Sequence, residues 1–164
     1  INKSFSKHSI NIELLGKGGI YANVSYEYNI NKNFVIGLGL GFMDYYQSNC
    51  INFFINTQGQ EEKEFGNCKK LDLAIPIYAT YKIEKKRNKN FLISAGVSPL
   101  ILLKYNNFPS KEKFYYYNDY NIYFASFGYE YMPNRFFYRI NIYTMYITSG
   151  IVIPWLGLSF GIKI

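Results

Sequence analysis

The chain has 164 residues, a length that fits one domain of ordinary size. Apolar residues make up 49% of it and charged residues 18%, which excludes a disordered chain. With 18 Tyr and 14 Phe but only 3 Met, the composition is a poor match to a helical bundle. The net charge of +7 could suit nucleic acid, but the densest basic run surrounds a predicted turn near residues 82–89, so we expect no nucleic-acid partner.

Apolar and polar residues alternate with a period of two in eight segments, which predicts eight β-strands. In chain order they span residues 10–15, 20–29, 34–43, 71–83, 91–103, 121–131, 136–147 and 151–164. Short turns join most of them, including a tight one at residues 16–19, whereas residues 47–70 and 106–120 are expected to be long connections. This pattern predicts an all-β domain over residues 1–164, an eight-stranded antiparallel up-and-down β-barrel.

The alternation leaves two environments open, because the apolar face points inward in a soluble lipocalin-like barrel and outward in a membrane barrel. The order of residues along the apolar face favours the membrane. Aromatic residues such as Tyr26 and Tyr138 lie near strand ends, whereas aliphatic residues such as Leu38 and Ile142 lie in the middle. A bilayer draws aromatic rings to the headgroup level and leaves its centre to aliphatic chains. We therefore predict a transmembrane barrel in a lipid bilayer.

The polar face of the predicted strands carries four acids and four bases, whose formal charges cancel. Opposite charges inside a narrow barrel can pair with one another, so we predict a charge plug in the lumen rather than a water-filled pore. The plug residues are Glu13, Glu27, Lys82, Glu130, Arg139 and Lys163.

Four segments, at residues 20–30, 75–83, 136–143 and 154–164, give the sequence a resemblance to a known family. It resembles the small eight-stranded outer-membrane barrels of Gram-negative bacteria, the size class of outer-membrane proteins A and X, over about residues 8–164. The last segment is similar to the C-terminal assembly signal of such barrels, but it ends in Ile164 rather than in an aromatic residue. The resemblance implies an outer-membrane location with periplasmic termini, and residues 1–9 would be a periplasmic tail. It does not imply one function, because the fold hosts anchors, adhesins, enzymes and accessory subunits.

The N-terminal residue is Ile1 and no apolar signal region follows it, so we expect a processed or trimmed form. Cys50 and Cys68 bracket the longest predicted connection. Their spacing does not suit a metal site, and an oxidising compartment favours a disulfide between them over two free thiols. We expect no metal and no cofactor.

His8 is the only histidine and lies in the predicted tail, away from the upper strands and loops where a catalytic base would be needed. A lipid-modifying enzyme is therefore disfavoured, and no catalytic residue is assigned. Near Pro76, Pro99 and Pro154 the polar face becomes apolar, which leaves three alternatives open. They are a binding site for a small hydrophobic ligand or lipid with a weakened lateral seam, a bulge that swaps the two faces, and simple packing of the upper barrel.

The two long connections are expected on the same side of the barrel. Each combines aromatic residues with mixed charges, which is typical of a protein-binding surface, although the rings could instead pack over the barrel mouth. The aromatic residues are Phe53, Phe54, Phe65, Phe114, Tyr115, Tyr116 and Tyr117. We therefore expect a non-enzymatic outer-membrane barrel that acts as a structural or accessory subunit and binds another envelope protein.

Overall fold

A computed structural model describes the backbone of residues 6–17, 19–55, 61–86, 88–106, 121–147 and 151–164. Side chains are described for the same residues except 19–21, 44–55, 61–71, 86, 102–106, 147 and 151. In these ranges no helix is long and apolar enough to cross a membrane.

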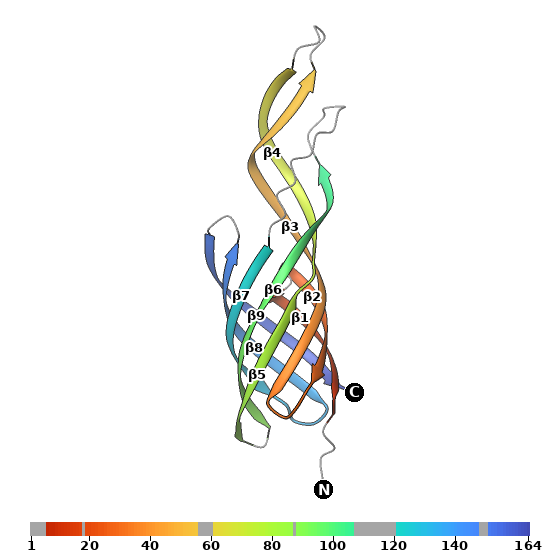
Figure 1. The fold of residues 1–164 in the computed structure, drawn as a ribbon, viewed down its shortest axis with the longest axis vertical. Helices are drawn as coiled ribbons and strands as arrows, with labels where there is room; N and C mark the ends of the chain where they lie inside the picture. The colour runs from red at the N-terminus through yellow and green to blue at the C-terminus, as the bar shows by residue number, and fades with distance from the viewer. Residues whose placement is uncertain (1–5, 18, 56–60, 87, 107–120, 148–150) are drawn as a thin grey trace.

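The described chain forms nine strands in one antiparallel sheet that closes on itself (Figure 1). The strands are β1 His8–Gly16, β2 Gly19–Asn29, β3 Phe34–Ile55, β4 Glu61–Ala74, β5 Ile77–Lys86, β6 Lys89–Asn106, β7 Asn121–Tyr131, β8 Phe136–Ile147 and β9 Ile151–Lys163. The ladder between β1 and β9 runs from Ser9 opposite Lys163 to Leu14 opposite Leu158 and closes the sheet. Because β4 and β5 both pair with β3 and β6, they are two pieces of one barrel strand. The fold is therefore a closed eight-stranded antiparallel barrel, as the alternation predicts.

The prediction of one continuous strand over residues 71–83 is wrong at Pro76, where the chain passes from β4 to β5. Proline has no backbone N–H to give to a ladder, so regular pairing stops there. The seam remains bonded nevertheless, because Gly39 N donates to Pro76 O at 2.9 Å and Ile75 N donates to Pro99 O at 3.0 Å. Ala74, Pro76 and Tyr78 are all buried, so the two faces are not exchanged at the break.

The prediction of a long connection at residues 47–70 is also wrong. β3 and β4 continue as a paired ribbon from Gly41 opposite Ala74 to Ile55 opposite Glu61, with an irregularity between Gln47 and Cys50. Hydrogen bonds between the two strands pair their backbone N–H and C=O groups. The segment therefore forms strands although many of its residues are polar or charged. Figure 1 shows this ribbon projecting beyond the barrel, away from the chain ends. The second expected connection, at 106–120, lies outside the described residues apart from Asn106, the last residue of β6.

The described ends of the chain meet at one end of the barrel, which we name the terminal end; the other is the distal end. Ile164 N donates to His8 O at 2.9 Å, and the Ser6 hydroxyl donates to Ile164 O. The predicted tail of residues 1–9 therefore overlaps β1, which starts at His8 because His8 already pairs with Tyr28. The β2–β3, β5–β6 and β7–β8 turns lie at the terminal end, and the β3–β4 ribbon leaves from the distal end (Figure 1).

The distribution of residues across the barrel wall is the reverse of that in a water-soluble barrel. Inward-facing residues are mostly polar or charged and nearly inaccessible, as are Asn11, Glu13 and Ser25. Outward-facing residues are mostly apolar, and many of the large ones are between 37% and 65% exposed. Only part of the lumen is apolar, where Tyr78, Ile122, Phe124, Tyr143 and Met145 pack together.

Candidate functional site: the lumen charges and the apolar outer wall

The first group of lumen charges is centred on Arg139 of β8. Its Nη1 and Nη2 donate to the two carboxylate oxygens of Glu27 at 2.5 and 2.9 Å, and its Nε donates to Glu130 Oε2 at 2.8 Å. Lys82 Nζ lies 3.4 Å from the same Glu130 oxygen, and the Asn90 amide donates to the other oxygen at 2.8 Å. The guanidinium carbon of Arg139 is also 4.2 Å from the centre of the Phe137 ring. We name Glu27, Lys82, Glu130 and Arg139 the arginine cluster.

The second group is centred on Glu13 of β1, whose side chain has no exposed surface. Each carboxylate oxygen accepts three hydrogen bonds from described residues. Oε2 accepts from the backbone N and Nζ of Lys17 and from Asn23, at 3.0 to 3.2 Å. Oε1 accepts from Asn141, Tyr143 and Ser159, at 2.6 to 3.3 Å. A buried carboxylate with this many donors is held as an anion in one position.

Tyr78 of β5 joins the two groups. Its hydroxyl donates to Glu27 Oε1 at 2.9 Å, and Lys17 Nζ lies 4.3 Å from the centre of its ring. Glu13, Lys17 and the arginine cluster are therefore connected through Tyr78 into one network, whose strand members come from β1, β2, β5, β7 and β8. Such a network fills the interior and ties together strands that share no backbone hydrogen bonds.

Lys17 is a lumen residue that the alternation does not predict. The period of two ends at Gly16, and residues 16–19 were expected to be an ordinary turn. In the structure Leu15 has a φ of 54°, in the left-handed region, and Lys17 is only 3% exposed because its side chain enters the lumen to reach Glu13. The signal that could have found Lys17 is local: the residues opposite Glu13 are Asn23 on β2 and Ser159 on β9, and neither is a base.

The structure thus brings together five of the six residues assigned to the plug, with Glu13 in one group and Glu27, Lys82, Glu130 and Arg139 in the other. The sixth, Lys163, lies half-buried near the end of β9 and takes part in none of the ion pairs of the described residues.

The structure describes only some of the aromatic residues that the sequence assigns to partner-binding loops. Phe53 and Phe54 belong to β3 and Phe65 belongs to β4, so they lie on strands rather than in a loop. Their side chains are outside the described set. Phe114, Tyr115, Tyr116 and Tyr117 lie outside the described residues altogether.

The two cysteines lie on the β3–β4 ribbon, where the ladder places Cys50 opposite Gly66 and Cys68 opposite Gln47. The disulfide itself falls on side chains outside the described set. The two cysteines nevertheless lie on adjacent paired strands, about two ladder positions apart. The irregularity between Gln47 and Cys50 lies between these two positions.

His8 lies at the terminal end and is exposed, with Nδ1 2.5 Å from the Tyr26 hydroxyl. Its ring also lies against Tyr28, at 5.4 Å between ring centres. Among the residues that the structure describes, no group of His, Cys, Asp and Glu is arranged to hold a metal ion.

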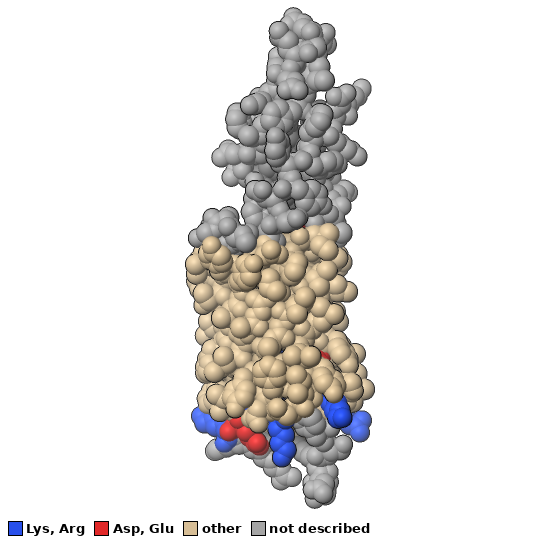
Figure 2. Space-filling view, viewed as in Figure 1, with Lys and Arg blue, Asp and Glu red and all other residues tan. Residues whose placement is uncertain are grey.

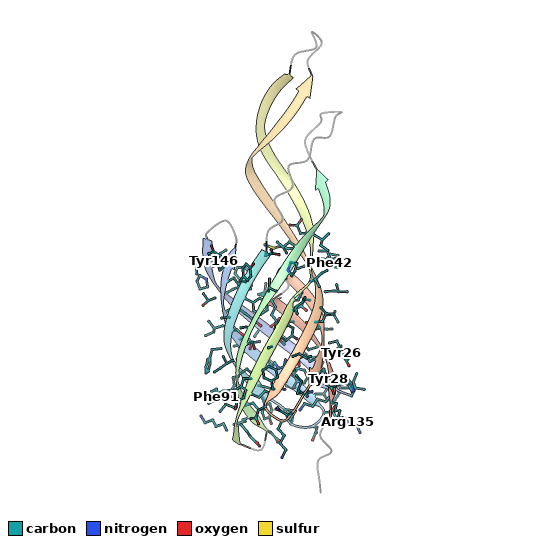
Figure 3. All side chains as sticks on the ribbon, in the orientation of Figure 1. Tyr26, Tyr28, Phe42, Phe91, Arg135 and Tyr146 are labelled. Atoms are coloured by element: carbon teal, nitrogen blue, oxygen red, sulfur yellow. The ribbon has the colours of Figure 1, made fainter. Side chains whose placement is uncertain are left out.

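The outer wall of the barrel is a continuous apolar surface. The described exposed residues of its middle band are almost all aliphatic, and Ile142, Leu38 and Leu40 are more than half exposed. Aromatic residues lie at both ends of this band: Tyr26, Tyr28 and Phe91 near the terminal end, and Phe42 and Tyr146 near the distal end (Figure 3). Figure 2 shows the uncharged wall, with Lys and Arg gathered at the terminal end.

The barrel resembles a solved outer membrane protein. The match is the Yersinia pestis outer membrane protein Ail, whose backbone structure was obtained in a phospholipid bilayer nanodisc, with a TM-score of 0.52 and 12% sequence identity. It covers 98% of this chain and 100% of that chain. At this identity the likeness shows the fold alone, which both chains share from end to end. No protein-family model matches the sequence, and no curated protein matches it.

Proposed function

We propose that this protein is an integral outer-membrane β-barrel that serves as a non-enzymatic structural or accessory subunit for another envelope protein. The observation that supports a membrane location most directly is the apolar outer wall. About thirty large apolar side chains on the described surface are at least 37% exposed, while most inward-facing residues are polar. Water makes such a surface unfavourable by about 25 cal/mol for each Å², whereas lipid chains cover it without that cost.

Two further observations support the same environment. The aromatic residues at the two ends of the wall match the girdles that lie at the two interfaces of a bilayer. The solved barrel with the same fold, Ail, is an outer membrane protein. The resemblance to the small outer-membrane barrels implies periplasmic termini, and with that orientation the β3–β4 ribbon would lie on the cell surface.

The accessory role rests on the β3–β4 ribbon. Within the described ladders, β2 pairs with β3 only as far as Gly41, and β6 pairs with β4 only as far as Lys69. Both strands of the ribbon continue beyond these points with an outer edge unused by other described strands. Such edges bind an added strand of another protein through backbone hydrogen bonds. The aromatic residues at 53–54, 65 and 114–117 would supply side-chain contacts on the same side of the barrel.

We assign no catalytic step to the protein, and we do not favour a ligand carrier. Tyr78, Phe124 and Tyr143 pack within the apolar part of the lumen, where a hydrophobic ligand would otherwise have to fit. The Phe124 and Tyr143 rings meet edge to face at 5.9 Å between their centres.

The membrane proposal is tested by purification and gel mobility. The protein should require detergent, and unheated samples should migrate differently from boiled ones on a denaturing gel, because closed barrels resist unfolding by detergent. A monodisperse monomer in the absence of detergent would refute the proposal.

The accessory proposal is tested by replacing Tyr115, Tyr116 and Tyr117 together. The triple Ser variant should stay heat-modifiable but lose the proteins that co-purify with the wild type from native membranes in mild detergent. The triple Phe variant is the matched control, and it should retain them because it keeps the rings. Recovery of the same partners in the same amounts with the Ser variant would mean that these tyrosines do not bind them.

A further inference from the structure

The exposed charges of the described surface are gathered at the terminal end and are mostly positive. Glu84 is the only exposed acid among the residues whose side chains are described. The exposed bases, which we name the basic rim, are Lys7, Lys32, Lys85, Lys89 and Arg135. Lys7 precedes β1, Lys32 lies in the β2–β3 turn, Lys85 and Lys89 flank the β5–β6 turn, and Arg135 lies in the β7–β8 turn. The blue atoms in Figure 2 mark this end of the molecule.

The basic rim gives the surface of the terminal end an excess of positive charge. The ion pairs of the described residues join Lys17, Lys82 and Arg139 to buried carboxylates, and none of them involves a residue of the rim. Glu13, Glu27 and Glu130 are therefore paired inside the lumen, whereas the described side chains exposed at the terminal end are five bases and one acid. A surface with this balance attracts anions.

The basic rim lies directly beside an aromatic girdle. Lys85 Nζ is 4.9 Å from the centre of the Phe91 ring, and the Phe91 ring is 6.0 Å from that of Tyr129. Rings of such a girdle lie at the headgroup level of a membrane. A cation held over one of them therefore lies near the depth of the lipid phosphates, with its aliphatic stem along the apolar wall.

One part of the basic rim forms an open hollow of about 530 Å³, lined by Asn31, Lys32, Asn33, Phe34 and Tyr81. The turn around it is fixed in place. Asn31 Oδ1 accepts hydrogen bonds from the backbone N of Asn33 and of Phe34, both at 2.8 Å, and the Asn33 amide donates to Lys82 O at 2.7 Å. An ammonium group, side-chain amides and two rings thus line one open depression of the surface, a combination that suits a phosphodiester with apolar chains attached.

We propose that the basic rim binds the phosphate groups of anionic phospholipids in the leaflet around the terminal end, with the hollow at Lys32 holding one headgroup. The inference rests on the proposed membrane function and adds the lipid class that the barrel selects. The charge balance of the rim favours a lipid with a net negative headgroup over a zwitterionic one, in which a choline cation cancels the phosphate. The rings of Phe34 and Tyr81, which line the hollow, favour a lipid over a free anion.

The experiment is native mass spectrometry of the whole protein released from bilayer nanodiscs that contain equal amounts of phosphatidylglycerol and phosphatidylcholine. The wild type should retain phosphatidylglycerol over phosphatidylcholine by at least about fivefold, the effect expected of one fully engaged cation at a lipid surface. A variant with Lys32, Lys85, Lys89 and Arg135 changed to Gln should retain the two lipids equally. Raising the salt concentration should reduce the preference of the wild type, which gives a second readout that needs no variant.

The matched control removes the same amount of charge from positions outside the basic rim. Lys63 and Lys69 lie on β4, and Lys111 and Lys113 lie in the segment between β6 and β7. Changing these four to Gln should leave the lipid preference intact. Equal retention of the two lipids by the wild type, or an equal loss of preference in both variants, would overturn the proposal.

Two other outcomes are also decisive. If the rim variant loses binding to isolated peptidoglycan while the wild type shows no lipid preference, the partner of the basic rim is an anionic cell-wall polymer and the lipid proposal is wrong. If the wild type retains neither lipid and does not enter nanodiscs, the membrane function itself fails. Insertion without a preference refutes the rim proposal alone.

Discussion

Arg139 on β8 and Glu27 on β2 form a two-pronged ion pair across the lumen, although 112 residues separate them in the sequence. Between β8 and β2 the barrel wall contains β9 and β1, so no backbone hydrogen bond joins the two strands. The ion pair therefore supplies a direct link between opposite parts of the wall. The same guanidinium binds Glu130 on the adjacent strand, so Arg139 pairs with both carboxylates of the arginine cluster.

Changing Arg139 to Met should destabilise the barrel by about 3 to 5 kcal/mol, because it leaves two buried carboxylates without their cation. The measurement is the urea midpoint of unfolding of the protein in lipid vesicles. Arg135→Met is the matched control: Arg135 is exposed in the β7–β8 turn, and its loss should change the midpoint little. Combining Arg139→Met with Glu27→Gln should recover part of the loss. An unchanged midpoint in the single variant would show that the cluster does not stabilise the fold.

Gly161 of β9 makes room for the ring of Phe137. A Cβ at position 161 would lie 2.2 Å from Phe137 Cζ, and the ring is fully buried with Arg139 on it. Gly161→Ala should therefore cost about 1 to 3 kcal/mol of overpacking in the same unfolding assay. Adding Phe137→Leu should relieve the contact and restore part of the stability. If the double variant is less stable than the sum of the two single changes predicts, contact with the Phe137 ring is not the cause of the destabilisation by Gly161→Ala.

Several features of the fold follow from the sequence because the period of two is visible over whole strands. The alternation predicts β7 and β8 with the observed bounds, and it places Glu27, Glu130 and Arg139 on the inward face. Long strands with one consistently apolar face have a fixed register, since a slip of one residue would put every apolar side chain on the wrong side.

Other features depend on contacts that no local pattern contains. Residues 47–70 are rich in polar and charged residues, and only the pairing of β3 with β4 makes them strands. The inward turn of Lys17 depends on a carboxylate that becomes available when β1 and β2 are paired. The pairing of Arg139 with Glu27 depends on closure of the barrel, so the sequence predicts a plug of balanced charge but not the partners within it.

The lumen network should prevent ion flow. Glu13, Glu27, Arg139 and Tyr143 occupy the interior with hydrogen-bonded side chains, and each is at most 5% exposed. An eight-stranded barrel has little interior volume beyond that needed for its side chains. Protein reconstituted in planar bilayers is expected to show no steady conductance. A constant, voltage-independent current that scales with the amount of inserted protein would show that the lumen conducts.

Cys50 and Cys68 should form an intramolecular disulfide in the protein isolated from an oxidising compartment. They lie on paired strands of the β3–β4 ribbon, and the ladder brings their backbones close. The bridge would close a loop of about 18 residues and contribute about 3 kcal/mol by restricting the unfolded chain. Intact-mass measurement should give a mass lower by two hydrogens than that of the reduced chain. Two thiols that react with an alkylating reagent without prior reduction would contradict this.

The outer wall offers a test that separates a membrane barrel from a soluble one at a single position. Ile142, near the middle of β8, is 63% exposed and lies opposite Leu156 and Phe127 on the neighbouring strands. In water, Ile142→Lys at such an exposed position should change stability by less than about 0.5 kcal/mol. In a bilayer the same change places an ammonium group near the midplane and should cost about 2 to 4 kcal/mol.

The control for this change is Asn134→Lys, which adds the same charge to the exposed β7–β8 turn. At the terminal end the new ammonium group would lie among the other cations of the basic rim and near the headgroups, where the cost of a charge falls to about 0 to 1 kcal/mol. Unfolding of both variants and the wild type in vesicles should therefore lower the urea midpoint for Ile142→Lys and leave that of Asn134→Lys close to the wild type. Equal midpoints for the two variants would mean that the wall at Ile142 faces water, and the membrane proposal would fail with it.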